Sequence, residues 1–226
     1  MTIRAENISK RYFRKTGQAN YFEAVKPLSL TLEEGAVTVL MGRSGGGKTT
    51  LLHMLAGLLT PTGGKVWLGD TDLYALPDAR LSRLRGEKIG VVPQGRSAID
   101  TLTVLENVLL PGQLRGQPKG RETALQWLEA LEIGQLADTR PAALSGGELR
   151  RAAIARTMTQ DPQVILADEP TGDLDDASTG LVLALLRKAA HEQGKTVFLV
   201  THESDALRYA DRAYRMDGGV LTEIIA

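Results

Sequence analysis

The sequence predicts an α/β fold built around a mostly parallel β-sheet, with an antiparallel β region at the N-terminus and an inserted block of helices. Three observations support this prediction. First, four short runs rich in valine, isoleucine and leucine are typical of parallel strands buried on both faces (residues 37–41, 89–92, 164–167 and 197–201). Second, apolar residues recur at helix spacing between residues 102 and 137. Third, the residues before the first run alternate between apolar and polar.

Composition narrows the class of protein. The chain has 226 residues, of which 42% are apolar and 24% charged, as in an ordinary globular protein that can bury a core without disulfides. Its 27 basic and 27 acidic residues cancel, so we expect no nucleic-acid partner. The absence of cysteine excludes disulfides and thiolate metal sites and fits a reducing cytoplasm. No apolar run approaches the roughly 20 residues that span a bilayer, so we expect any membrane contact to be indirect.

The N-terminal segment has the pattern of an antiparallel edge region. Residues 3–9 and 24–32 alternate between apolar and polar side chains, and Tyr12 lies between these two segments. The first buried strand, residues 37–41, follows directly. We therefore expect an antiparallel β region in front of the parallel sheet.

A glycine-rich loop follows that first strand and precedes a predicted helix over residues 50–58. It matches the phosphate-binding pattern G-x-x-x-x-G-K-[ST] and is made of Gly42, Arg43, Ser44, Gly45, Gly46, Gly47, Lys48 and Thr49. Its glycines let the backbone wrap around phosphates, Lys48 adds a positive charge, and the Thr49 hydroxyl can ligate Mg²⁺. The alternative is a glycine-rich turn with a chance lysine, which the strand, loop and helix context disfavours. We include Thr50 in the site, and the motif predicts a P-loop NTPase core.

Two carboxylates end the third buried strand. Asp168 is suited to bind magnesium, and Glu169 is suited to polarise an attacking water. The carboxyl ends of parallel strands meet at one edge of a sheet, so both would lie beside the phosphate loop. The alternative is an acidic helix N-terminus, because Pro170 follows and carboxylates stabilise that end of a helix.

Two further polar residues follow strands. His202 ends the last apolar run and could hydrogen-bond a γ-phosphate or the attacking water. Gln94 follows residues 89–92 and could ligate magnesium or water. Taken alone, each could equally be a passive polar residue at a strand end.

A second candidate anion site follows the helical block. Pro111, Gly112, Gly116, Pro118 and Gly120 are expected to divide the block into two helices. After it come Leu144, Ser145, Gly146, Gly147 and Glu148, and the Ala- and Arg-rich stretch that follows predicts a helix beginning at that point. A helix start with uncovered backbone N–H groups can bind an anion.

Taken together and in this order, these motifs resemble those of ATP-binding-cassette ATPases over nearly the whole chain. The run from Leu144 to Glu148, which we call the signature run, is the motif that separates this family from other P-loop proteins. The run 171–175 also matches the family. The resemblance implies that Tyr12 stacks on adenine, although Tyr12 could also be an ordinary edge-strand tyrosine beside Phe13, Tyr21 and Phe22.

The resemblance also implies how the protein works. Two copies would pair head to tail as a homodimer around ATP and Mg²⁺, with Ser145, Gly146, Gly147 and Glu148 of one copy at the nucleotide held by Lys48 of the other. Glu169, His202 and Lys48 would be catalytic, Thr49, Gln94 and Asp168 would hold the metal, and Asp175 would lie at the dimer seam. Transmembrane permease subunits would bind the dimer at the cytoplasmic face of the inner membrane. We expect one domain, with residues 1–92 and 160–226 as its core and 93–159 as the helical subdomain.

Finer features resemble the branch of this family that contains LolD, MacB and FtsE, for example the strings 50–53, 56–58, 61–64 and 102–108. Export or extraction driven by ATP is the expected role. The alternatives are a mechanical or regulatory ATPase like FtsE, a soluble cassette without transport function, and a P-loop kinase. Three departures from the branch stand out: the segment 95–98, Asp173 in place of asparagine, and Leu149 in place of a polar residue.

Overall fold

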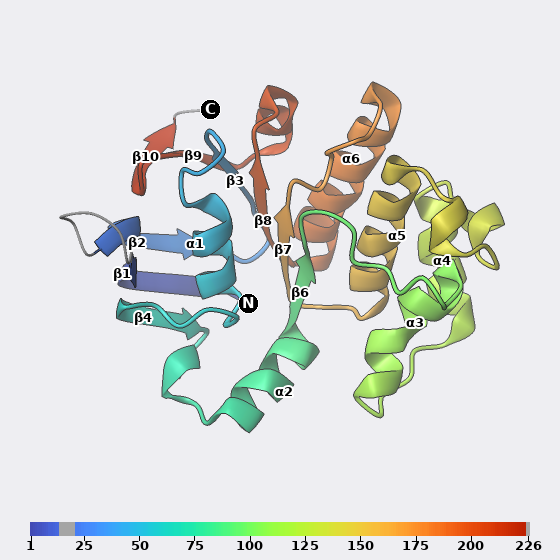
Figure 1. Cartoon of the computed structure of the whole chain (residues 1–226), viewed down its shortest axis with the longest axis horizontal. Helices are drawn as coiled ribbons and strands as arrows, with labels where there is room; N and C mark the ends of the chain where they lie inside the picture. Colours follow the sequence, from blue (N-terminus) through green and yellow to red (C-terminus); the bar gives the residue numbers. More distant parts are fainter. Residues whose placement is uncertain (14–20, 225–226) are drawn as a thin grey trace.

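The computed structural model describes residues 1–13 and 21–224 and consists of two β-sheets with helices packed against them (Figure 1). The strands are β1 (Ile3–Phe13), β2 (Tyr21–Leu32), β3 (Val37–Met41), β4 (Gly63–Leu68), β5 (Thr71–Asp72), β6 (Ile89–Val92), β7 (Val164–Asp168), β8 (Thr196–Thr201), β9 (Arg212–Asp217) and β10 (Val220–Ile224). The α-helices are α1 (Lys48–Leu55), α2 (Asp78–Lys88), α3 (Val104–Leu114), α4 (Arg121–Ala130), α5 (Gly146–Thr159) and α6 (Asp176–Gln193). Short 3₁₀ helices cover Leu73–Ala75, Gly134–Leu136, Pro141–Ala143 and Ser204–Tyr209.

The larger sheet contains the parallel strands, in the order β10-β9-β3-β8-β7-β6. Strands β9, β3, β8, β7 and β6 are parallel, and β10 runs antiparallel to β9 at the edge. Every residue of β7 and β8 is buried. The four apolar runs are thus confirmed as strands, and the β9–β10 hairpin is an addition that the sequence analysis did not predict.

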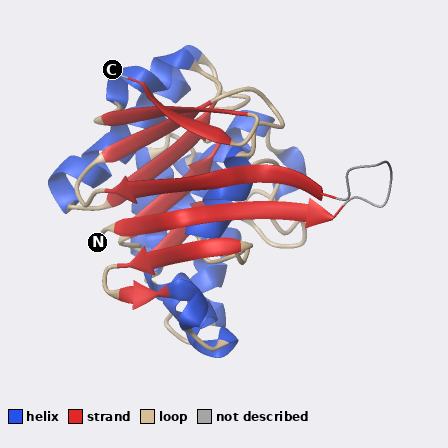
Figure 2. Cartoon of the chain, turned by 90° about the vertical axis from the view of Figure 1, so that its left-hand side faces the viewer, coloured by secondary structure: helices blue, strands red, loops and turns tan. Residues whose placement is uncertain are grey.

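The smaller sheet is antiparallel, in the order β2-β1-β4-β5, and lies across the larger one (Figure 2). It confirms the predicted N-terminal β region, but β1 and β2 are both longer than the alternating segments. The register of β1 against β2 shifts between Ala5 and Ile8 and again between Ile8 and Arg11. Such irregularities interrupt the alternation of side chains, so the sequence pattern ends before the strand does.

The helical block contains α3, α4 and α5, which lie together on the side of the molecule away from the smaller sheet (Figure 1). The predicted division of the block into two helices is confirmed, but Pro111 and Gly112 take no part in the break, because α3 continues through both residues to Leu114 and α4 begins at Arg121. Pro111 lies in the last turn, and a proline there removes one N–H donor without ending the helix. The chain leaves the helix at Gly116, whose φ of +66° is in the left-handed region.

The larger sheet separates two hydrophobic cores. Alternate residues of β8 show this division: Val197 and Leu199 belong to the core that contains α6 and the helical block, whereas Phe198 and Val200 pack with α1 and the smaller sheet. Strand β7 divides in the same way. Because side chains alternate across a strand, a strand buried on both faces positions the two layers relative to each other.

Candidate functional site

The glycine-rich loop forms the turn between β3 and α1, as predicted. Helix α1 begins at Lys48, directly after Gly47. The Lys48 Nζ amine donates hydrogen bonds to the carbonyl oxygens of Gly42 at 2.7 Å and Arg43 at 3.1 Å. These bonds hold the amine inside the curve of the loop, beside the N-terminus of α1, where a phosphate would find both a cation and backbone N–H groups.

The loop passes so close to its neighbours that it requires glycine. A Cβ atom on Gly47 would overlap the carbonyl oxygen of Ala24, and one on Gly42 would overlap the carbonyl oxygen of Met216. Gly47 also has a φ of +101°. The loop therefore packs directly on the backbones of β2 and β9, which fixes its shape.

Asp168 ends β7 beside this loop. Its Oδ2 accepts a hydrogen bond of 2.6 Å from the Thr49 hydroxyl, and only 2% of the residue is exposed. Burial raises the pKa of the Asp168 carboxyl, although the bond from Thr49 acts in the opposite direction. The alternative of an acidic helix N-terminus was wrong, because a turn follows β7 and α6 begins only at Asp176.

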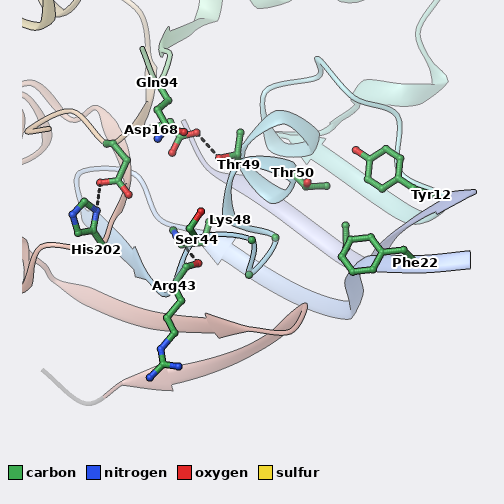
Figure 3. Close-up of a pocket in the computed structure, with 15 residues that line it drawn as sticks. Tyr12, Phe22, Arg43, Ser44, Lys48, Thr49, Thr50, Gln94, Asp168 and His202 are labelled. Carbon is green, nitrogen blue, oxygen red and sulfur yellow. Dashed lines mark hydrogen bonds and ion pairs between the residues drawn. The ribbon is translucent and has the colours of Figure 1, made fainter. Parts of the chain in front are cut away.

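Glu169 and His202 form a pair. The Glu169 Oε2 and the His202 Nδ1 lie 3.0 Å apart, and this hydrogen bond raises the pKa of the His202 ring (Figure 3). The Glu169 backbone has a φ of +50°, and its N–H donates to the Val200 carbonyl at 2.7 Å. A left-handed φ at a residue other than glycine is uncommon, and here the bond to β8 helps to hold it. The sequence analysis named both residues but not their contact.

A cavity of about 680 Å³ joins these groups. Most of the predicted site residues of the phosphate loop and the strand ends line it, together with Ala24 and Phe22. The lining residues are Tyr12, Phe22, Ala24, Arg43, Ser44, Gly45, Gly46, Gly47, Lys48, Thr49, Thr50, Gln94, Asp168, Glu169 and His202.

Two aromatic rings stand at one end of the cavity. Tyr12 and Phe22 are direct partners across the β1–β2 ladder, and each is 40% exposed. Figure 3 shows both rings on the same side of α1, beyond Thr50. The sequence analysis predicted Tyr12 as a site residue and missed Phe22. Phe22 could have been found as an aromatic residue on the strand that pairs with the one carrying Tyr12, two positions before Ala24. Both rings can contact a flat base.

The signature run lies elsewhere in the same chain. Ser145 precedes α5 and forms a capping box: its Oγ accepts from the Glu148 N–H, and Glu148 Oε2 accepts from the Ser145 N–H at 2.7 Å. The Ser145 N–H and the Ser145 hydroxyl both donate to Glu148 Oε2, and these two bonds lower the pKa of the Glu148 carboxyl. Asp175 caps α6 by accepting from the Ser178 N–H at 2.7 Å. No residue of the signature run lines the cavity of its own chain, and neither does Asp175.

The groups that line the cavity can bind a nucleoside triphosphate and a hard cation. Thr49, Asp168 and Gln94 offer oxygen atoms, which Mg²⁺ prefers. Among the described residues no group of three or more histidine, cysteine or acidic side chains could hold a metal ion. A cation at this position would therefore depend on phosphate oxygens as well as on the chain.

Part of the chain matches a known protein family. Residues 25–172 match the family model described as "ABC transporter". No helix of the described chain is both long and apolar enough to cross a membrane.

Curated relatives and solved structures match nearly the full length. The lipoprotein-releasing system ATP-binding protein LolD of Xanthomonas oryzae is 38% identical over 98% of this chain and 91% of its own. An uncharacterized ABC transporter ATP-binding protein of Methanocaldococcus jannaschii is 40% identical over 98% and 96%. The dimeric structure of that cassette superposes with a TM-score of 0.91 at 35% identity, covering 99% of both chains. A second dimeric structure of it, in a post-hydrolysis state with ADP and Pi, also gives 0.91 at 34% identity and 99% coverage of both.

Replacing Gly47 by alanine tests the close packing of the loop. We expect Gly47→Ala to lower the free energy of unfolding by about 3 kcal/mol, because overpacking and a positive φ both oppose a Cβ atom. Gly45→Ala is the matched control, since Gly45 has a φ of +79° but nothing within 4 Å of a Cβ; it should cost about 1 kcal/mol. Urea unfolding followed by circular dichroism measures both. Equal losses would contradict the packing argument.

The bond between Glu169 and His202 predicts a change in histidine titration. Because the Glu169 carboxylate stabilises the protonated ring, Glu169→Gln should lower the pKa of His202 towards its ordinary value. The stabilisation that the protonated ring supplies is thus fully present below the ordinary pKa of histidine, where Glu169 is ionised, and it is lost as the pH rises through the raised pKa of His202. NMR titration of the ring proton measures this change, and the His191 signal is the control because His191 bonds Asp211 instead. An unchanged His202 titration would mean that the bond does not form in solution.

Proposed function

The chain belongs to the ABC transporter family, and we propose that a head-to-tail dimer of it couples ATP turnover at shared sites to the movement of membrane-spanning partners. As a member of this family it is an ATP-binding subunit that hydrolyses ATP to ADP and phosphate and works as a dimeric cassette. The proposal concerns how the two copies share each site, which residues perform the reaction, and what the reaction drives.

One observation carries the shared-site proposal: each chain holds two separate halves of a phosphate site. The cavity contains Lys48 and Glu169, whereas the signature run begins α5 outside it. The N–H groups of Gly146 and Gly147 have no hydrogen-bond acceptor among the described residues. Two-fold symmetry lets each chain place its signature run against the cavity of the other, so both half-sites are completed at once.

The residues of the cavity have distinct roles in this proposal. Tyr12 and Phe22 contact the base, the loop 42–49 wraps the phosphates, and Lys48 neutralises their charge. Glu169 accepts the proton of the attacking water as its oxygen adds to the γ-phosphorus in line with the departing ADP. Glu169 raises the pKa of His202, which favours the protonated ring, and a ring N–H can donate a hydrogen bond to the γ-phosphate.

We also propose that Mg²⁺ binds between the nucleotide and the end of β7. The Thr49 hydroxyl and the buried Asp168 carboxylate already lie within 2.6 Å of each other, and Gln94 lines the same cavity. Burial raises the pKa of Asp168, so a cation nearby would stabilise its charged form. When bound, Mg²⁺ supplies charge neutralisation at the phosphate oxygens.

The segment after Gln94 connects the cavity to the helical block. Arg150 of α5 donates to the Pro93 carbonyl at 2.7 Å, and Arg156 donates to the Ser97 carbonyl at 2.8 Å and its hydroxyl at 2.6 Å. A displacement of Gln94 is therefore transmitted to α5. We propose that this path carries closure of the dimer to permease subunits bound near the segment 95–98.

The proposed cellular role is export or extraction. The Xanthomonas relative is named as part of a lipoprotein-releasing system, which supports release of a membrane-held substrate. In this role the subunit binds permease subunits at the cytoplasmic face of the inner membrane. The predicted subdomain 93–159 would move relative to residues 1–92 and 160–226. Identification of the membrane protein that copurifies with the chain tests this role.

Replacing Glu169 tests its role as the base. We expect Glu169→Gln to lower the ATPase rate by about 10²-fold or more, because an amide cannot accept the proton of water. The variant should still bind ATP, since the phosphate loop is intact. Steady-state phosphate release and nucleotide binding measure the two properties. Turnover near the rate of the unchanged protein would remove Glu169 from the catalytic role.

Mixing two inactive variants tests the shared site. Lys48→Ala removes the cation of the cavity, and Ser145→Arg blocks the signature run. In a mixed head-to-tail dimer one site combines the intact Lys48 of one chain with the intact Ser145 of the other. We expect each variant alone to be inactive and the mixture to recover up to about a quarter of the ATPase activity per chain, because random mixing makes half of the dimers mixed, each with one intact site. No recovery, with mixed dimers present on a sizing column, would argue against the head-to-tail arrangement.

A further inference from the structure

Asp173 is an acid beside the signature run that has no pairing partner among the described residues. It lies in the turn between β7 and α6, has a φ of +67° and is exposed. A Cβ atom on Gly146 would lie 3.4 Å from the Asp173 Cβ and 3.6 Å from its Oδ2. Its carbonyl oxygen would lie 3.0 Å from a Cβ on Gly147. The Asp173 carboxylate therefore sits against the backbone that would receive the partner's nucleotide.

The neighbouring acids are already engaged within the chain. Glu148 accepts from Ser145 in the capping box, and Asp175 accepts from the Ser178 N–H. Asp173, by contrast, has no ion pair or side-chain hydrogen bond with any described residue. Its charge next to the signature run would repel the γ-phosphate unless a cation offsets it.

Arg43 is the matching base on the phosphate loop, and its side chain has no partner in the part of the chain that the structure describes. Its carbonyl oxygen accepts from the Lys48 amine at 3.1 Å, so its backbone lies beside the group that meets the phosphates. Its side chain is exposed and points away from Thr49 and Asp168 (Figure 3). The guanidinium pairs with no acid of the described chain, even though Asp217 lines the same hollow of the surface.

We propose that Arg43 forms an ion pair with Asp173 of the partner subunit across the ATP-bound dimer. This inference rests on the proposed head-to-tail dimer, in which the phosphate loop of one copy faces the signature run of the other. Arg43 is part of the first surface, and Asp173 touches the second. Two-fold symmetry then makes the pair twice, and each pair offsets a negative charge beside a γ-phosphate.

The pair makes closure of the dimer selective for a partner that carries a cation at position 43. An acid at position 173 facing a phosphate loop without a cation would oppose closure, whereas the same acid facing Arg43 favours it. Lys48 cannot take this role, because its amine is enclosed by the loop carbonyls of Gly42 and Arg43. Each chain therefore has a positive charge on one half-site and a negative charge on the other, and a second copy of the chain can pair with both.

Charge reversal in a mixture of two variants tests the pair. In a Glu169→Gln background with saturating ATP and Mg²⁺, we expect Arg43→Asp and Asp173→Arg each to weaken dimerisation by about tenfold or more, because both homodimers place like charges opposite each other. Their 1:1 mixture should form heterodimers with affinity within about threefold of the parent, because each seam then joins opposite charges. Sedimentation of differently tagged chains measures the species. The differences should shrink in about 1 M salt.

Two controls separate the possible causes. Binding of a fluorescent ATP analogue to each monomer checks that the concentration of ATP used is saturating for Arg43→Asp. Arg215→Asp replaces a base that lines the same hollow as Arg43; mixed with Asp173→Arg, it should form its own homodimers and few heterodimers.

The outcomes distinguish this inference from the proposed function. If the parent does not dimerise with ATP, the shared-site dimer is overturned and the ion pair with it. If the parent dimerises but each single variant dimerises equally well, the ion pair alone is overturned. The same holds if the mixture of the two variants dimerises no better than each variant alone. Rescue in the Arg43→Asp and Asp173→Arg mixture but not in the Arg215→Asp mixture supports the pair.

Discussion

The hydrogen bond between Thr49 and Asp168 is the contact on which the site depends. It joins the start of α1 to the end of β7 across 119 positions of the sequence. A buried carboxylate needs a partner, and the Thr49 hydroxyl supplies one. Burial still raises the pKa of Asp168, so the chain alone does not fully compensate this charge. Because Glu169 follows immediately, the same bond also fixes the distance between the proposed base and the phosphate loop.

The two cores explain how one chain holds two half-sites. One core packs α1 and the smaller sheet and supports the phosphate loop, whereas the other packs α3, α4, α5 and α6 and supports the signature run. The strands between them contribute alternate side chains to both cores. Each half-site is therefore anchored in its own layer, and the shared strands set the relative positions of the two layers. A second copy related by two-fold symmetry meets both layers at once.

The sequence was informative where a residue type is required by geometry. Only glycine fits at Gly47, and both faces of β7 and β8 are buried, so the phosphate loop and these strands could be predicted. The bond between Glu169 and His202 could not, because it depends on the register in which Asp168 pairs with Val200. The β9–β10 hairpin was missed because many of its residues are polar and exposed, so its two short strands lack a clear apolar pattern. Phe22 was missed because it lines the cavity through its pairing with Tyr12 on β1, and the sequence does not show which residues of β1 and β2 face each other.

The arginines of α5 give the two halves a physical connection. Arg150 bonds the carbonyl of Pro93, and Arg156 bonds Ser97, so both ends of the segment around Gln94 are attached to the helix that begins at the signature run. Gln94 lines the cavity of its own chain, whereas α5 would meet the nucleotide of the partner in the proposed dimer. In that dimer a change at one nucleotide would shift the half-site offered to the other. In the proposed dimer these hydrogen bonds would couple the two nucleotide sites, because a displacement of Gln94 would pull on the segment that Arg150 and Arg156 tie to α5.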